Sequence, residues 1–185
     1  VRAPQGRKRS KWLGNGSCPR GSIDQAGADA LRFTLATGNS PGNDRRFSTE
    51  RVEASRNFCN KIWNASRFIQ MNLTIDKDKA AELPEALTIE DKWIVSKYNT
   101  LIAEVTRNID QYEPGLAAAK PNDFIWDHFC DWYTEMVNPR LYTAADAPKA
   151  ATLYTMKNVL ANDLQILRPS MPILPETIFS NLPDQ

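Results

Sequence analysis

Residues 48–73 combine side chains whose types and spacing suit contact with unpaired nucleotides. On a helix that turns by about 100° per residue, a cation, two carboxamides and a ring fall within an arc of roughly 60°: Asn57, Lys61, Asn64 and Phe68. Three polar side chains flank this arc: Arg56, Asn60 and Arg67. Cations pair with phosphates, carboxamides pair with base edges, and an exposed ring stacks on an unpaired base for roughly 1–3 kcal/mol. The pattern predicts a surface that reads single-stranded RNA.

The same residues leave a structural alternative open. The opposite side of the helix forms a predicted core stripe about 100° wide: Val52, Ser55, Cys59, Ile62, Ser66 and Ile69. If a second layer of structure also covered the polar side, Phe68 would be buried and the carboxamides would cap loops.

Other kinds of site find little support in the sequence. His128 is the only histidine, so neither a Ser–His–Asp nor a Cys–His nucleophilic site can be assembled. A metal site built from Asp127, His128 and Asp131 is disfavoured because adjacent helical residues point to different faces. We therefore expect no metal, and a structural or surface role for His128. The neighbouring aromatic residues are predicted to pack in the core or between domains: Trp126, Trp132 and Tyr133.

Composition is that of an ordinary globular domain, with 42% hydrophobic and 24% charged residues in 185. No run approaches the roughly eighteen apolar residues of a membrane span, so no membrane contact is expected. The basic start lacks the apolar stretch of a secretory signal, and the missing initiator Met suggests an excised piece. The widely spaced Cys18, Cys59 and Cys130 fit neither a disulfide framework nor a zinc site, which favours a reducing, cytoplasmic compartment.

The formal net charge of +1 hides an uneven distribution. Residues 1–68 carry thirteen Lys/Arg and five Asp/Glu, whereas residues 69–185 carry ten and seventeen. A basic N-terminal third suits a polyanion, because phosphate contacts supply most non-specific affinity for nucleic acid. An acidic and a basic face that complement each other within one molecule would give the same distribution.

The periodicity predicts an all-α protein: an antiparallel helical bundle preceded by a loop segment and a short helix. The loop covers residues 1–22, and turn-forming residues 39–44, 76–84 and 142–148 separate the later elements. Predicted helices cover residues 24–36, 48–73, 88–112, 122–137, 150–167 and 176–182. Residues 116–120, just before Pro121, form either a separate turn or the far side of a kink.

Two stretches closely resemble the valyl-tRNA synthetases. They are residues 27–44, GADALRFTLATGNSPGND, and residues 51–68, RVEASRNFCNKIWNASRF. Weaker similarity continues through residues 124–133 and 167–172, so the resemblance covers nearly the whole chain in the order of the family. The NKIWNASRF block is specific, since isoleucyl relatives carry a more Arg-rich counterpart.

The resemblance implies the helical anticodon-binding domain of a class I synthetase. In this family the matching helix presents its Lys, Asn and terminal Phe to the valine anticodon loop. By position these are Lys61, Asn64 and Phe68, which helical geometry alone had already grouped. The implied partner is the anticodon stem-loop of a valine tRNA, with Asn57, Arg67, Arg56 and Asn60 as further candidate contacts.

Near the N-terminus, residues 6–15 stand where the family has its mobile Lys-Met-Ser-Lys-Ser loop. That loop stabilises charge that develops on the ATP phosphates. Lys8, Ser10 and Lys11 match the pattern, whereas Arg9 replaces the Met and Trp12 replaces the final Ser. Without the resemblance, this segment is simply a flexible basic tail.

The resemblance implies a two-part fragment of a valine–tRNA ligase, expected to be catalytically inactive by itself. Residues 1–46 would be the end of the catalytic domain, with the signature-loop remnant and a connecting helix, and residues 47–185 the anticodon-binding bundle. The whole enzyme would use ATP with magnesium, while this chain needs no cofactor. Its other partners would be the missing catalytic and editing domains, and the protein is expected to be a monomer. The alternative is a stand-alone RNA-binding or protein-interaction bundle without synthetase function.

Overall fold

A computed structural model describes residues 2–3, 5–16, 18–37, 44, 46–75, 84, 86–143 and 146–182. The predicted all-α class is confirmed: in these residues the only β-type pairing consists of two isolated bridges near the N-terminus. After the short turn η1 (Lys11–Leu13), the helices in chain order are α1 (Pro19–Ala26), α2 (Ala28–Ala36), α3 (Thr49–Ile75), α4 (Ile89–Asp110), α5 (Pro114–Asp123), the π-helical η3 (Phe124–Tyr133), α6 (Thr134–Thr143), α7 (Asp146–Leu167) and α8 (Ile173–Phe179).

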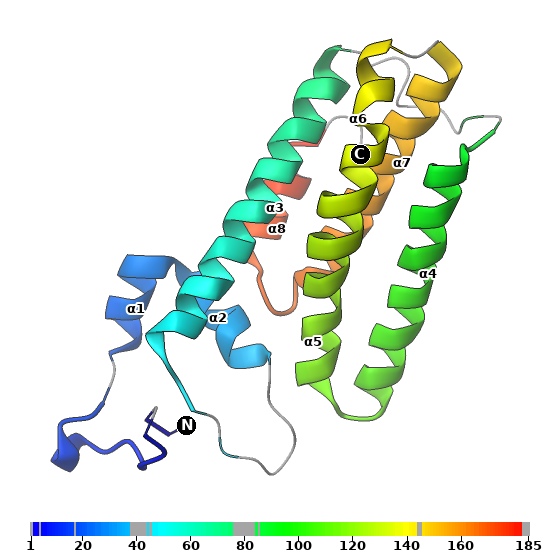
Figure 1. Cartoon of the computed structure of the whole chain (residues 1–185). Coiled ribbons are helices and arrows are strands. Elements are labelled where there is room, and N and C mark those ends of the chain that lie inside the picture. Colours follow the sequence, from blue (N-terminus) through cyan, green and yellow to red (C-terminus); the bar gives the residue numbers. More distant parts are fainter. Residues whose placement is uncertain are drawn as a thin grey trace.

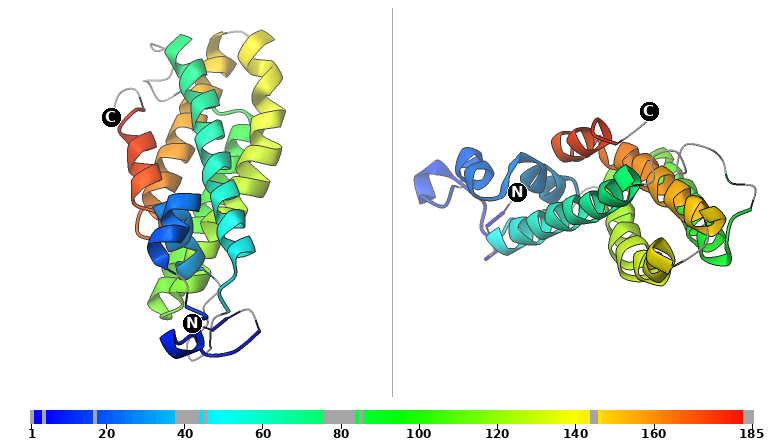
Figure 2. Two further views of the ribbon diagram at one scale, coloured as in Figure 1. Left: turned by 90° about the vertical axis from the view of Figure 1, so that its left-hand side faces the viewer. Right: turned by 90° about the horizontal axis from the view of Figure 1, so that it is seen from above.

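The long helices of the bundle lie side by side, and consecutive ones run in opposite directions (Figure 1). The segments α5, η3 and α6 follow one another directly and form one rod, which runs beside α3, α4 and α7. Helix α8 packs on α3 and α7, and α1 and α2 cross the first turns of α3 at one end of an elongated molecule (Figure 2). The N-terminal segment lies beyond that end, away from the bundle.

Apolar periodicity explains the main core. The predicted stripe on α3 is buried at Val52, Ser55, Ile62, Ser66 and Ile69, while Cys59 is partly buried. The two serines satisfy their hydroxyls locally: the Ser66 hydroxyl donates to the Ile62 carbonyl at 2.7 Å, and the Ser55 hydroxyl donates to the Arg51 carbonyl at 3.1 Å. The stripe missed Phe58, whose ring is buried 5.2 Å from the Phe33 ring of α2.

Several predicted boundaries are wrong. The single helix expected over residues 24–36 is two helices, because Gly27 adopts a φ of 90°, outside the helical region, and the first of them begins inside the expected loop at Pro19. The helix expected over residues 122–137 is the middle of the longer rod, in which residues 116–120 are helical and Pro121 is accommodated. The last two helices begin earlier than predicted, at Asp146 and Ile173, since prolines near a helix start lose no internal hydrogen bond. Most of residues 39–44 and 76–84 lies outside the described part.

A buried polar network fixes the rod against the start of α4. Thr88 and Asp91 form a capping box at this end, and Asp91 also accepts a 2.7 Å hydrogen bond from the Tyr133 hydroxyl. Arg140 donates to the Thr88 hydroxyl at 2.9 Å and to Glu90 at 2.8 Å. Tyr133 is fully buried at the end of η3, so the network sets the rotation of the rod next to α3.

Candidate nucleic-acid interface

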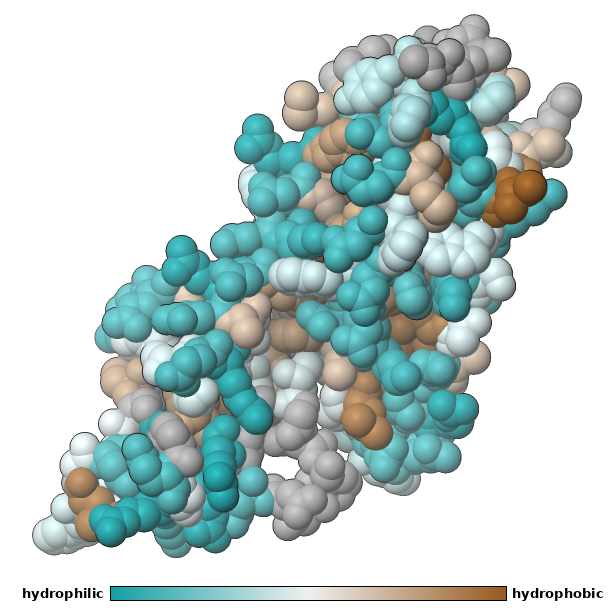
Figure 3. All heavy atoms as spheres, in the orientation of Figure 1, coloured by the Kyte–Doolittle hydropathy of each residue, from teal (hydrophilic) through white to brown (hydrophobic). Residues whose placement is uncertain are grey.

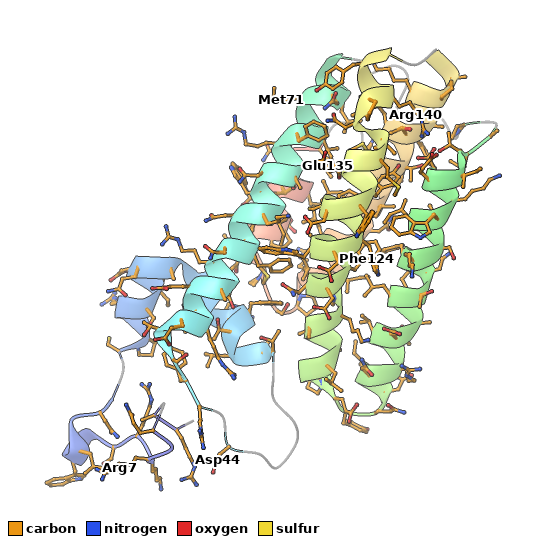
Figure 4. The ribbon with its side chains drawn as sticks, viewed as in Figure 1. Arg7, Asp44, Met71, Phe124, Glu135 and Arg140 are labelled. Carbon is orange, nitrogen blue, oxygen red and sulfur yellow. The ribbon has the colours of Figure 1, made fainter. Side chains whose placement is uncertain are left out.

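A solvent-open groove of about 330 Å³ lies between α3 and the η3–α6 part of the rod. Four of its lining residues come from α3: Lys61, Asn64, Ala65 and Phe68. The other four come from the rod: Cys130, Asp131, Thr134 and Glu135. Figure 4 labels Glu135 between α3 and α6 and Met71 on the side of α3 away from the rod. The three residues that the resemblance singled out therefore converge on one depression.

Local structure explains which side chains face the groove. On α3 the lining residues lie at spacings of three and four, so they form one stripe. On the rod, η3 has π-helical hydrogen bonding, which widens each turn and shifts the angular positions of the residues that follow it. A π-helical segment of this kind is uncommon and often marks a functional site.

Lys61 is held inside the groove by two contacts. Its ammonium lies 2.5 Å from Asp131 Oδ1 and 4.8 Å from the centroid of the Trp126 ring. Its side chain is 30% exposed, compared with 47% for Asp131. A ligand can reach both charged groups, which are already paired with each other before it binds.

The expectation of full exposure is wrong for two members of the predicted surface. Lys61 and Phe68 are both partly buried instead of fully exposed, and Phe68 packs against the main core from the groove side. The helical wheel treats α3 as having one covered side, whereas the rod covers a second side next to the first. The alternative of a second layer is therefore partly correct, although one part of Phe68 still lines the open groove.

The remaining predicted contacts lie outside the groove. Asn57, Arg56, Asn60 and Arg67 are exposed on α3 but do not line it. Two large apolar residues, Trp63 at 43% exposure and Met71 at 63%, lie on the same exposed side of α3. The polar pattern of the sequence gives no signal for either of them. Hydrophilic residues predominate over this face, and its apolar patches are small and separate (Figure 3).

Thiol chemistry is disfavoured at the groove. Burial is the main reason that the pKa of the Cys130 thiol is raised to about 12; Asp131 and Asp163 contribute to the rise, and the nearby Lys61 partly offsets it. Burial likewise raises the pKa of Cys59 to about 11. Both thiols therefore stay protonated near neutral pH and are poor nucleophiles. Within the described residues, no cluster of His, Cys, Asp and Glu is placed to hold a metal ion.

The aromatic residues of η3 have different roles. The ring of His128 makes edge contacts with Trp93 and Phe124, which agrees with the predicted structural role. Tyr133 is buried as expected, and Trp126 packs on the core and supports Lys61. The core or domain-packing role predicted for Trp132 is not realised within this chain, because its side chain is 63% exposed.

The candidate ATP loop forms a separate unit at the other end. Arg2 pairs with Asp44, the Phe47 amide donates to the Arg2 carbonyl at 3.0 Å, and the Arg9 guanidinium lies 4.9 Å from the Phe47 ring centroid. Figure 4 labels Arg7 and Asp44 in this unit, well away from the groove.

Two of the three residues that match the signature-loop pattern can be placed there. Lys8 is exposed, and the Ser10 amide donates to Asn15 Oδ1 at 2.8 Å. Lys11 belongs to η1, but its side chain lies outside the described part.

Comparisons with known proteins agree with this layout. Residues 91–185, more than half of the chain, match the family described as the anticodon-binding domain of tRNA ligase. The chain belongs to this family. Residues 1–48 match a second description, tRNA synthetases class I (I, L, M and V).

Individual relatives of this anticodon-binding domain point the same way. The valine–tRNA ligase of Clostridium acetobutylicum is 51% identical over 98% of this chain and 21% of its own length. That of Symbiobacterium thermophilum is 50% identical over 99% of this chain and 20% of its own length. The chain thus spans about a fifth of these relatives. The family resemblance predicted from residues 27–44 and 51–68 is confirmed.

Solved structures share the fold of the domain. The Mycobacterium tuberculosis methionyl-tRNA synthetase bound by methionyl-adenylate superposes with a TM-score of 0.80, over 96% of this chain and 36% of that one. Its 20% sequence identity supports a shared fold alone. Among the described residues, no helix is both long and apolar enough to cross a bilayer.

Proposed function

We propose that this chain is the anticodon-binding part of a valine–tRNA ligase and that the groove between α3 and the rod receives unpaired bases of the anticodon loop. One observation carries the proposal: a cation, a carboxamide and an aromatic ring, Lys61, Asn64 and Phe68, line a single open groove. Relatives that are about half identical over the whole chain and named valine–tRNA ligase support the choice of tRNA.

The chemistry of the groove suits a base better than a phosphate. Asp131 and Glu135 place two carboxylates in the lining, which disfavours an anion. A base offers a π-face to Phe68 and hydrogen-bonding edges to Asn64 and Lys61. Phosphates of the loop would instead meet the exposed Arg56 and Arg67 on the outer side of α3.

The two ends of the chain would then have separate tasks. We assign residues 1–46 to the end of the catalytic domain and residues 47–185 to the anticodon-binding bundle, and the family match over residues 1–48 supports a boundary near α3. In the whole enzyme, Lys8, Ser10 and Lys11 would approach ATP and its magnesium, and the enzyme would act as a cytoplasmic monomer. Arg9 and Trp12 replace two residues of the loop motif. The assignment of residues 6–15 to the ATP loop therefore needs a test of its own, separate from the test of the groove.

The direct test is a titration of the chain with a fluorescent valine anticodon stem-loop. Lys61→Ala should weaken binding roughly tenfold, because it removes a charged contact from the groove. Ile109→Ala is a suitable control, since Ile109 is 58% exposed and lies near the far end of α4. Equal affinity of both variants and the unchanged protein would contradict the proposed site. Tight binding to a protein segment that is insensitive to salt would favour an interaction bundle instead.

A further inference from the structure

The outer side of the rod carries a ridge of exposed apolar side chains. Trp132, Met136 and Pro139 follow one another at spacings of four and three residues, so they lie on one side of the rod. Trp132 is 63% exposed, Met136 is 42% exposed, and Pro139 is also exposed. The rod lies at the front of the bundle, between α3 and α4 (Figure 1). The ridge is therefore open to a partner.

A row of carboxylates runs beside this ridge. The row consists of four exposed residues that recur at every fourth position: Asp123, Asp127, Asp131 and Glu135. Its last two members directly precede Trp132 and Met136 in the chain, so the row follows one flank of the ridge. Residues 121–139 contain no Lys or Arg. The outer face of the rod is therefore both apolar and negatively charged.

The cations closest to the row already have partners. Lys120, before the start of the row, lies 2.8 Å from Glu104. Arg140, just past its end, lies 2.8 Å from Glu90. Within the described residues, only one carboxylate of the row has an ion pair, and its partner is Lys61. Most of the negative charge of the row is therefore left for a ligand to neutralise.

The chemistry of this face fits a basic, amphipathic segment of another protein. A guanidinium group binds a carboxylate through two parallel hydrogen bonds, and it also stacks on an indole ring. Arg side chains can therefore contact both the row and Trp132, while aliphatic side chains of the same segment cover the ridge. RNA is disfavoured, because carboxylates repel phosphates. The same face of a second copy is disfavoured, because it would bring like charges together.

We propose that the outer face of the rod, residues 123–139, docks an Arg-containing amphipathic helix of a partner protein. Trp132 is its central contact, since tryptophans near the centre of an interface commonly dominate the affinity. At 1.5 Å per residue this face is roughly 25 Å long, which corresponds to a partner helix of about 16 residues. The inference goes beyond the proposed function and does not depend on RNA binding in the groove.

The test uses a fluorescein-labelled synthetic helix of about 16 residues with Arg on one side and Leu on the adjacent side. In a control probe, every Arg is replaced by Glu. The unchanged chain should bind the Arg probe at least about tenfold more tightly than the Glu probe in fluorescence anisotropy. Trp132→Ala should weaken binding of the Arg probe at least about tenfold, whereas Trp63→Ala should change it by less than about twofold. Trp63 is a matched control because it is a 43% exposed tryptophan on α3.

A second pair of variants tests the charge. Asp127→Asn should weaken binding of the Arg probe roughly two- to fivefold, the effect of one exposed ion pair. Asp110→Asn, which changes an exposed carboxylate at the end of α4, should have no measurable effect. Asp131 and Glu135 are left unchanged, because they also line the groove. If Trp132→Ala lowers the melting temperature markedly, the comparison of Asp127→Asn with Asp110→Asn decides.

Several results would overturn the proposal. Equal affinity for the Arg and Glu probes would show that the row attracts no basic partner, and equal effects within either pair of variants would remove the docking site from the rod. If Trp132→Ala weakens binding of an anticodon stem-loop and leaves binding of the Arg probe unchanged, the face belongs to RNA. A dimer in sedimentation that Trp132→Ala dissociates would show that a second copy covers the ridge.

Discussion

Replacing Phe68 by alanine separates the two roles that the structure gives this side chain. Phe68 packs partly on the core and partly lines the groove. Truncating a fully buried Phe costs about 3–5 kcal/mol, so a partly buried one next to an open groove should cost about 1–2 kcal/mol. For a chain of this length, that corresponds to a fall in melting temperature of roughly 2–8 °C.

The expected effect of Phe68→Ala on RNA binding is separate and comparable in free energy. Loss of one base–ring stack costs roughly 1–3 kcal/mol, or about 5- to 150-fold in affinity. Calorimetry gives the melting temperature, and fluorescence anisotropy with a labelled anticodon stem-loop gives the affinity at a temperature where the variant is fully folded. Ile109→Ala, an exposed apolar truncation on α4, should change neither quantity appreciably.

Two results would refute this reasoning about Phe68. A folded variant with unchanged affinity would show that the ring does not stack on RNA. A loss of stability above about 3 kcal/mol, with a collapsed fold, would identify Phe68 as a core residue whose groove-facing edge has no function.

Three further predictions concern the framework of the groove. Tyr133→Phe should destabilise the chain by about 1–3 kcal/mol in urea unfolding, because it removes the hydroxyl that the buried Asp91 accepts from; unchanged stability would mean that water replaces it. The hydrogen bond from Arg140 lowers the pKa of Glu90, so this pair should stabilise the fold above pH 4.5 and lose its effect as the pH falls further. Glu90→Gln should abolish that part of the pH dependence of stability, and a stability profile identical to that of the unchanged chain would contradict the prediction. Burial raises the pKa of Asp163 well above its usual value, so stability should decline as the pH rises above about 4. Asp163→Asn should be more stable than the unchanged chain at pH 8 and similarly stable at pH 4. A variant less stable than the unchanged chain at pH 8 would show that the carboxylate is stabilising.

The sequence predicts one side of the site well because a single helix contains it. Lys61, Asn64 and Phe68 recur at helical spacing, so their common stripe follows from α3 alone. The buried positions Ile62 and Ile69 follow from the same periodicity.

The other side of the groove depends on information that no local pattern contains. Asp131 lies seventy residues from Lys61, and the π-helical turn that shifts its position has no simple sequence signal. The half-burial of Phe68 has the same origin, since a helical wheel does not show that the rod covers a second side of α3. The helical periodicity also does not predict the break at Gly27, although a glycine inside an expected helix is a usable signal.

The most direct test of the central claim is a titration of this chain with matched and mismatched anticodon stem-loops at two salt concentrations. The valine stem-loop should bind more tightly than one whose anticodon adenine and cytosine are replaced, and its affinity should fall roughly tenfold between 50 and 200 mM salt. Equal affinities for matched and mismatched loops, or no salt dependence, would contradict recognition of anticodon bases by the groove between α3 and the rod.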